Sequence, residues 1–182
     1  MLRVSIIFCL IAGTFAQSLR PGPCRKVNVK PIDFNRMSGV WYAHATSPDN
    51  FDPLQIGLKQ LWSQPCNGVT DVLFTGLLTT TNQNLTVEAD AYTNEDNALI
   101  YDIHIPILGV SHRERQILET DYENYSISRN CTNVGSNHFE NIGIFTREQN
   151  PSINYANLGY RVFARYGLRA PEIIKIDQQC CA

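Results

Sequence analysis

The chain has 182 residues, of which 43% are hydrophobic and 10% aromatic, so its composition is that of a folded protein rather than a disordered one. Its 15 Lys and Arg residues against 17 Asp and Glu residues give a net charge of −2, which provides no basic excess for binding a nucleic acid. Charged residues make up 18%, below the usual ~25%, so the surface is rich in Asn, Ser, Thr and Gln. Such a surface suits an extracellular protein.

The first 16 residues have the pattern of a secretory signal peptide. Arg3 supplies a positive charge, residues 4–11 form an apolar run of 8, and Ala16 ends a stretch suited to cleavage. A transmembrane helix needs roughly 20 apolar residues, and no run in the sequence approaches that length. We therefore predict a signal peptide at residues 1–16, secretion, no membrane span, and a single domain over residues 17–182.

Cysteine content indicates disulfides. Cys9 lies in the predicted signal, which leaves Cys24, Cys66, Cys131 and the neighbouring pair Cys180 and Cys181. An odd number of cysteines in an oxidising compartment permits at most two bridges and leaves one thiol over. No Cys-x-x-Cys or Cys/His spacing typical of a metal site is present, so we expect structural cysteines and no metal.

Three Asn-x-Ser/Thr sequons, at Asn84, Asn124 and Asn130, predict N-glycosylation. Asn124 and Asn130 lie six residues apart in one expected strand. Because strand side chains alternate between faces, these two are expected on the same face, both accessible or both inward.

Short apolar stretches separated by turn residues predict a series of β-strands. In residues 85–92 and 98–105 the odd-numbered positions are mostly apolar, which is the alternation of a half-buried strand. Residues 50–68 are expected to form a long loop. The predicted strands are residues 39–46, 71–78, 85–92, 98–105, 116–120, 122–131 and 139–146.

One helix is predicted near the C-terminal end. Tyr155, Leu158, Val162 and Tyr166 recur at helical spacing and form one face, which we expect to pack against the outside of a sheet. Pro151 or Ser152 is expected at its start and Gly167 at its end.

Consecutive antiparallel strands with short connections predict an all-β fold. Seven or eight such strands leave exposed edges unless the sheet closes, and an eight-stranded up-and-down barrel closes it around one small ligand. Many expected inward residues are small, which favours a cavity over a filled interior. They are Ala43, Ala45, Ala89, Ala91 and Gly143.

Three segments resemble the motifs of the lipocalin family, in the family's order and over nearly the whole predicted mature chain. Residues 34–42 contain Gly-x-Trp at Gly39 to Trp41, residues 120–122 are Thr-Asp-Tyr with Cys131 downstream, and residues 144–147 end an apolar strand in Arg147. Among lipocalins, the sequence resembles the insect bilin-binding, crustacyanin and apolipoprotein D-like members.

The resemblance implies an eight-stranded barrel with a short helical segment closing one end and a helix outside. It implies that Arg147 stacks on Trp41 at the closed end, in a structural role, as a cation–π contact of roughly 0.5–2 kcal/mol. It further implies a Cys24–Cys131 disulfide and a second one from Cys66 to Cys180 or Cys181.

The predicted function is extracellular binding and transport of a small hydrophobic ligand such as a retinoid, carotenoid, bilin, fatty acid or steroid, including pigments. Strand alternation assigns the lining, with Tyr101 as its polar group. No cofactor beyond such a ligand is expected, and assembly into homo- or hetero-oligomers is left open. The predicted ligand-binding residues are Leu85, Val87, Ala89, Leu99, Tyr101, Ile103, Phe139 and Phe145.

Other functions receive less support from the sequence. No Gly-x-Ser-x-Gly, His-Glu-x-x-His or phosphate-binding loop is present, so we predict no catalytic residues and no enzyme. An isomerase would need a reactive cavity cysteine, and haem binding would need one inward histidine, for which His104 is the candidate. The main alternative is a secreted protein-binding lipocalin that acts through its mouth loops.

Overall fold

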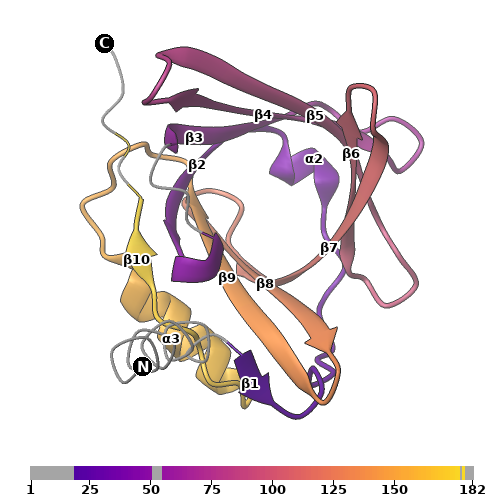
Figure 1. Ribbon diagram of the computed structural model, residues 1–182, viewed down its shortest axis with the longest axis vertical. Coiled ribbons are helices and arrows are strands. Elements are labelled where there is room, and N and C mark those ends of the chain that lie inside the picture. Colours follow the sequence, from indigo (N-terminus) through magenta and orange to yellow (C-terminus); the bar gives the residue numbers. More distant parts are fainter. Residues whose placement is uncertain (1–18, 51–54, 177, 179–182) are drawn as a thin grey trace, which may run out of the picture.

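The computed structural model describes residues 19–50, 55–176 and 178, and it shows a closed antiparallel β-barrel (Figure 1). The predicted signal peptide, Cys180 and Cys181 lie outside the described residues. None of the described helices is long and apolar enough to cross a membrane. The elements are β1 (Leu19–Pro21), α2 (Phe34–Met37), β2 (Gly39–Thr46), a 3-10 turn (Pro48–Asn50), β3 (Gln55–Trp62), β4 (Thr70–Leu78), β5 (Gln83–Thr93), β6 (Leu99–Ile105), β7 (Gly109–Thr120), β8 (Tyr125–Val134), β9 (Asn137–Thr146), α3 (Tyr155–Arg165) and β10 (Ile174–Lys175).

Eight strands, β2 to β9, form the barrel wall within the described residues. Each strand pairs with the next one along the chain, and β9 closes the ring by pairing with β2 through Tyr42 and Thr146. The short strands β1 and β10 extend this sheet beside β9 and β2. The predicted fold class is therefore confirmed: an up-and-down barrel in which no long strand edge is left open.

The predicted strand pattern missed one strand and misplaced the ends of others, including β8, which was expected over residues 122–131. Residues 55–62, expected to lie in a loop, form β3, whose alternation is interrupted by a register shift between Ile56 and Lys59. β7 begins at Gly109 rather than at residue 116. In both cases polar or glycine residues stand where a regular strand would carry apolar ones.

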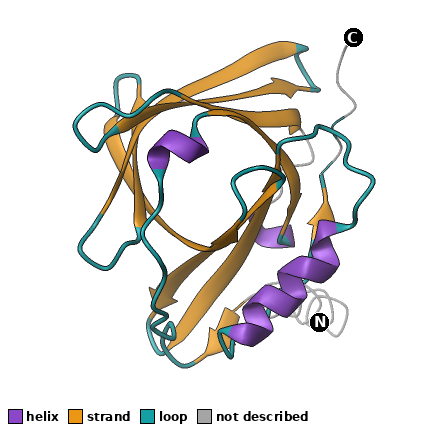
Figure 2. Cartoon of the chain, turned by 180° about the vertical axis from the view of Figure 1, so that it is seen from behind, coloured by secondary structure: helices purple, strands orange, loops and turns teal. Residues whose placement is uncertain are grey.

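Helix α3 packs on the outside of the barrel, as predicted (Figure 2). Val162 and Phe163 are fully buried against Ile142 and Ile144 of β9 and their neighbours. The helix starts later than expected, because the Asn154 side chain caps it by accepting a hydrogen bond from the Ala156 N–H. Its end is as predicted, with Gly167 at φ 65° in the left-handed conformation that glycine adopts without strain.

The Thr-Asp-Tyr segment builds the turn between β7 and β8. Burial raises the pKa of the Asp121 carboxyl, but the N–H groups of Tyr125, Asn124 and Glu123 and the Asn124 amide outweigh this and bring the pKa below its ordinary value. The Asn124 amide donates to Asp121 at 2.8 Å. Asn124 therefore belongs to the turn and precedes β8, and it is not a strand residue equivalent to Asn130.

The segment from β1 to α2 runs along the outside of the barrel and is held by one disulfide. Cys24 is bonded to Cys131 of β8, with Cα atoms 5.9 Å apart and a sequence separation of 107. This is the pairing that the family resemblance implied. The Cys24 N–H also donates to the Asn133 side chain at 2.7 Å. Cys66 is exposed.

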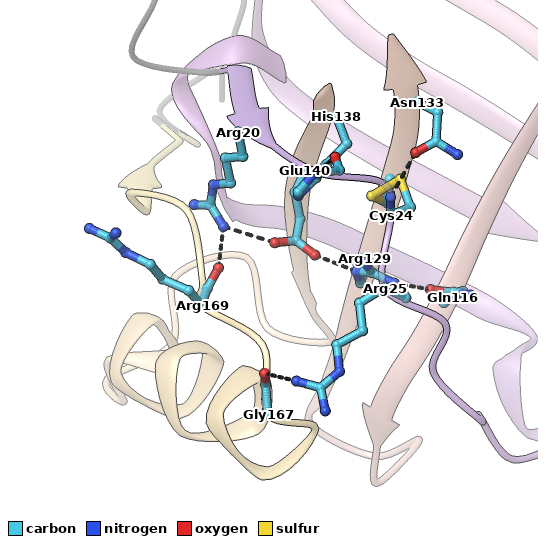
Figure 3. Close-up of polar contacts among 12 residues, drawn as sticks. Arg20, Cys24, Arg25, Gln116, Arg129, Asn133, His138, Glu140, Gly167 and Arg169 are labelled. Carbon is cyan, nitrogen blue, oxygen red and sulfur yellow. Dashed lines mark hydrogen bonds and ion pairs between the residues drawn. A yellow bond between two sulfur atoms is a disulfide. The ribbon is translucent and has the colours of Figure 1, made fainter. Parts of the chain in front are cut away.

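A buried ion network joins this segment to the barrel (Figure 3). Glu140 of β9 accepts from Arg129 Nε at 2.6 Å and from Arg20 Nη1 at 2.8 Å. Arg129 also donates to the Arg25 carbonyl and to the Gln116 side chain. Arg129 and Glu140 retain only 1% and 4% of their exposed surface, so the pair lies away from bulk water.

His44 predicts a pH dependence of folding. Its ring is buried in β2, edge-on to Tyr155 at 5.8 Å, and burial, followed by the charge of Lys175, lowers its pKa below 6.5. The unfolded chain then binds a proton that the native chain does not, so the free energy of unfolding falls as pH drops below about 6.5. Urea unfolding from pH 8 to 5 should show this fall, and His44→Gln should reduce it. Equal slopes in the two proteins would contradict the prediction.

Candidate functional site

The half of the barrel next to α2 is filled by side chains. Trp62 packs edge-on to Tyr101 at 5.9 Å, and Phe74 does so at 5.4 Å. The small inward residues Ala89 and Ala91 lie among these rings, so they accommodate large neighbours instead of leaving space, contrary to the expectation. Only a void of about 10 Å³ remains there. The buried residues of this plug are Met37, Trp41, Trp62, Val72, Ala89, Ala91, Leu99, Tyr101 and Ile117.

Above this plug lies a cavity of about 240 Å³. Its walls come from β2, β3, β4, β5, β7 and β9, together with Ile176 just after β10. Three of its wall residues, Ala43, Ala45 and Gly143, are small, as predicted for a hollow interior. The lining residues are Ala43, Ala45, Thr46, Asn50, Gln55, Leu58, Lys59, Gln60, Phe74, Thr75, Leu85, Arg115, Gly143, Phe145 and Ile176.

The structure separates the predicted lining residues into groups. Leu85 and Phe145 line the cavity. Val87 lies on β5 between Leu85 and the plug residue Ala89, and it borders a surface hollow next to the β6–β7 turn. Phe139 shares the parity of Phe145, but it pairs with Leu19 of β1 and lines none of the described pockets inside the barrel. The remaining four belong to the plug or pack against it: Ala89, Leu99, Tyr101 and Ile103.

Arg115 of β7 was not foreseen in the interior. It lies level with Leu99 and lines both the cavity and the void inside the plug, so its guanidinium forms part of the cavity floor. Burial lowers the pKa of Arg115, and the nearby Tyr101 has its pKa raised by burial. Tyr101 is therefore a neutral hydroxyl beside a cationic guanidinium.

Three other polar side chains face the same region. The Gln60 carbonyl oxygen accepts from the Trp62 indole at 3.0 Å, which leaves the Gln60 amide free to point a donor into the interior. Ser128 and Ser126 border the void from β8, and Ser128 donates to the Gly143 carbonyl at 3.2 Å. The floor is thus polar while most of the wall above it is apolar.

Arg147 and Trp41 lie at the closed end and away from the cavity. The guanidinium stacks over the indole at 3.9 Å, and the indole donates to the Met37 carbonyl at 2.8 Å. Arg147 also donates to the carbonyls of Tyr122, Val40 and Arg36. Burial lowers the Arg147 pKa, and the charge of Asp121 opposes this effect. These contacts tie α2 to the barrel, so we propose a structural role for both residues.

The other candidate groups lie outside the cavity. His104 is exposed on the outer wall, 3.1 Å from Asp90, which does not support the haem alternative. No cluster of three or more metal-binding side chains occurs among the described residues. Asn84 and Asn124 are exposed, whereas Asn130 is partly covered beside the disulfide, so the two sequons of β8 and its turn are not equivalent.

Comparison with known proteins identifies the fold. No family model matches the sequence, and no curated protein matches it. Among solved structures, lobster apocrustacyanin A1 superposes with a TM-score of 0.72 at 21% identity, over 90% of this chain and 92% of that one. Insecticyanin from the tobacco hornworm Manduca sexta superposes with a TM-score of 0.75 at 18% identity, over 88% and 89%.

A biogenic amine-binding protein matches less well, with a TM-score of 0.58 at 14% identity, over 83% of this chain and 85% of that one. Crustacyanins and insecticyanin are lipocalins, and the protein described here has the lipocalin fold. The expected family architecture is thereby confirmed.

Proposed function

We propose that this protein binds and carries a small hydrophobic molecule in extracellular fluid. The cavity of about 240 Å³ above the aromatic plug is the observation that supports this function. Burial of apolar ligand surface stabilises a complex by ~25 cal/mol per Å² before the entropic costs of association. The barrel limits those costs because its closed, hydrogen-bonded wall is already ordered.

The size of the cavity favours slender ligands. Pockets for drug-sized molecules usually measure ~300–1,000 Å³, and this one is smaller. A fatty acid or a short retinoid-like chain fits such a space better than a carotenoid, bilin or steroid. The plug blocks deeper entry, so a ligand would occupy the half of the barrel away from α2.

Blocking the cavity tests this proposal. Leu85 lines the cavity and is partly exposed, so Leu85→Trp should fill the binding space without unfolding the barrel. Calorimetric titration with decanoic acid, decanol and retinol should give saturable binding to the wild type, at least about 10-fold weaker in the variant. Leu61→Trp adds the same ring at an exposed outer position and should bind like the wild type. Absence of binding by the wild type, or equal binding by Leu85→Trp, would contradict the proposal.

A protein-binding role is the second candidate, because the tip of the β6–β7 turn exposes apolar side chains. Ile107 and Leu108 are almost fully exposed there, and Val110 is half exposed. Solvent-exposed apolar clusters of this kind mark interaction sites. A protein partner held by this tip would bind the Leu85→Trp variant as well as the wild type, which separates the two functions.

A further inference from the structure

Arg115 is a cation that has no anionic partner among the described residues. It points from β7 across β8 toward β9, and its Nη1 atom lies 3.0 Å from the position that a Cβ on Gly143 would occupy. The absence of a side chain at Gly143 therefore makes room for the guanidinium. Arg115 is partly exposed, and it lines both the cavity and the void beneath it.

Two other enclosed arginines have partners, whereas Arg115 has none among the described residues. Arg129 is bonded to Glu140, and Arg147 donates to three carbonyls. Arg115 makes no hydrogen bond or ion pair with any described residue. Burying a guanidinium without a partner is energetically unfavourable, so folded proteins rarely contain one without another reason. A ligand that supplies the missing anion would provide that reason.

The surroundings of Arg115 favour an anion over a neutral or cationic group. No Asp or Glu is among the described residues that line the cavity, and the second cation there is Lys59. Tyr101, whose hydroxyl makes no hydrogen bond to a described residue, adds a donor beside Arg115. A guanidinium fork matches the two oxygens of a carboxylate, and such charge-assisted bonds are about twice as strong as neutral ones.

We propose that the cavity takes an amphipathic acid, whose carboxylate binds Arg115 at the floor, next to the plug residue Tyr101, and whose apolar chain lies against Leu85 and Phe145. This inference rests on the proposed carrier function and specifies the chemistry of its ligand. In this orientation the polar end of the ligand lies at the aromatic plug, and its apolar end lies toward the mouth of the barrel.

Three probes of equal chain length test the proposal: decanoic acid, decanol and decylamine, titrated at pH 7.5 by calorimetry. The wild type should bind decanoate at least about 10-fold more tightly than decanol and should bind decylamine least. Arg115→Met should weaken decanoate by about 10- to 100-fold and leave decanol within about 3-fold. Tyr101→Phe should weaken decanoate by a smaller factor. Arg161→Met removes the same charge from the exposed face of α3 and should change nothing.

The outcomes distinguish this inference from the carrier function. If decanoate and decanol bind equally well, or if Arg115→Met binds both as the wild type does, the acid specificity is wrong and the carrier function stands. If none of the probes binds, both proposals fail. Thermal unfolding of the ligand-free proteins tests whether Arg115 has only a structural role. Arg115→Met should melt no lower than the wild type. A lower melting temperature together with an unchanged decanoate affinity would overturn the inference.

Discussion

Replacing Glu140 by Gln should lower the free energy of unfolding by about 3–5 kcal/mol, because it leaves Arg129 buried and without a counter-charge. The substitution keeps the shape of the side chain, so packing is unchanged and the loss reports the charge. Arg129 retains its bonds to the Arg25 carbonyl and Gln116, but neither neutralises a guanidinium that is 1% exposed. Arg20 loses the same partner at smaller cost, because it is 23% exposed and can turn to solvent.

A double variant separates the cost of an orphaned charge from the value of the pair. In Arg129→Met with Glu140→Leu, no buried charge is left alone, and buried ion pairs replaced by apolar residues often give neutral or more stable proteins. The double variant should therefore unfold at higher urea concentration than Glu140→Gln alone. Equilibrium urea unfolding with tryptophan fluorescence measures all three proteins. A loss below about 1 kcal/mol for Glu140→Gln would mean that water reaches this network in solution.

Where the sequence follows regular alternation, the structure could be predicted from it. The strands β5 and β6 pair without a register shift around a short turn, so the odd-numbered residues of both point inward, as expected for Leu85, Ala89 and Tyr101. The odd–even alternation of a strand shows which face a side chain lies on, but it does not show where along the barrel axis that side chain lies. Phe139 shows this limit, because β9 continues beyond the barrel and pairs there with β1.

Two features that decide the site could not be read from periodicity. The pairing of β2 with β9 shifts register between Ala43 and Ala45, and the pairing of β3 with β4 shifts between Ile56 and Lys59; alternation alone predicts neither shift. Arg115 stands in a run of charged and polar residues that resembles a loop. A charge facing inward breaks the rule by which strands are recognised, and such breaks are expected at functional sites.

For a related reason, the sequence could not show which of the small inward residues would leave empty space. Side-chain volume at one position does not show what faces it across the barrel. Gly143 leaves room beside the cavity, whereas Ala89 is covered by the rings of the plug. The difference depends on Trp62 and Phe74, whose strands could not be placed in register from the sequence. The expected hollow therefore occupies one half of the barrel instead of its full length.

Truncating Trp41 to Ala should cost about 3–5 kcal/mol of unfolding free energy, which makes the closed end as sensitive as the ion network. The indole is fully buried in the plug, and it is bonded to the Met37 carbonyl and covered by Arg147. The variant loses buried area, leaves a cavity, and removes the surface on which the guanidinium stacks. Ligand affinity measured under native conditions should change less than about 3-fold, because Trp41 lines the void in the plug and is absent from the cavity wall.

A double-mutant cycle isolates the stacking itself. With Trp41→Leu and Arg147→Met as single and combined variants, the coupling energy should be about 0.5–2 kcal/mol, the range for partly to fully desolvated cation–π pairs. Arg36 stacks on Tyr122 at 4.2 Å in an exposed position and provides the matched control. Its cycle, Arg36→Met with Tyr122→Leu, should couple more weakly, because water screens the charge. Equal coupling in both cycles would mean that the enclosure of Arg147 adds nothing to the stacking energy.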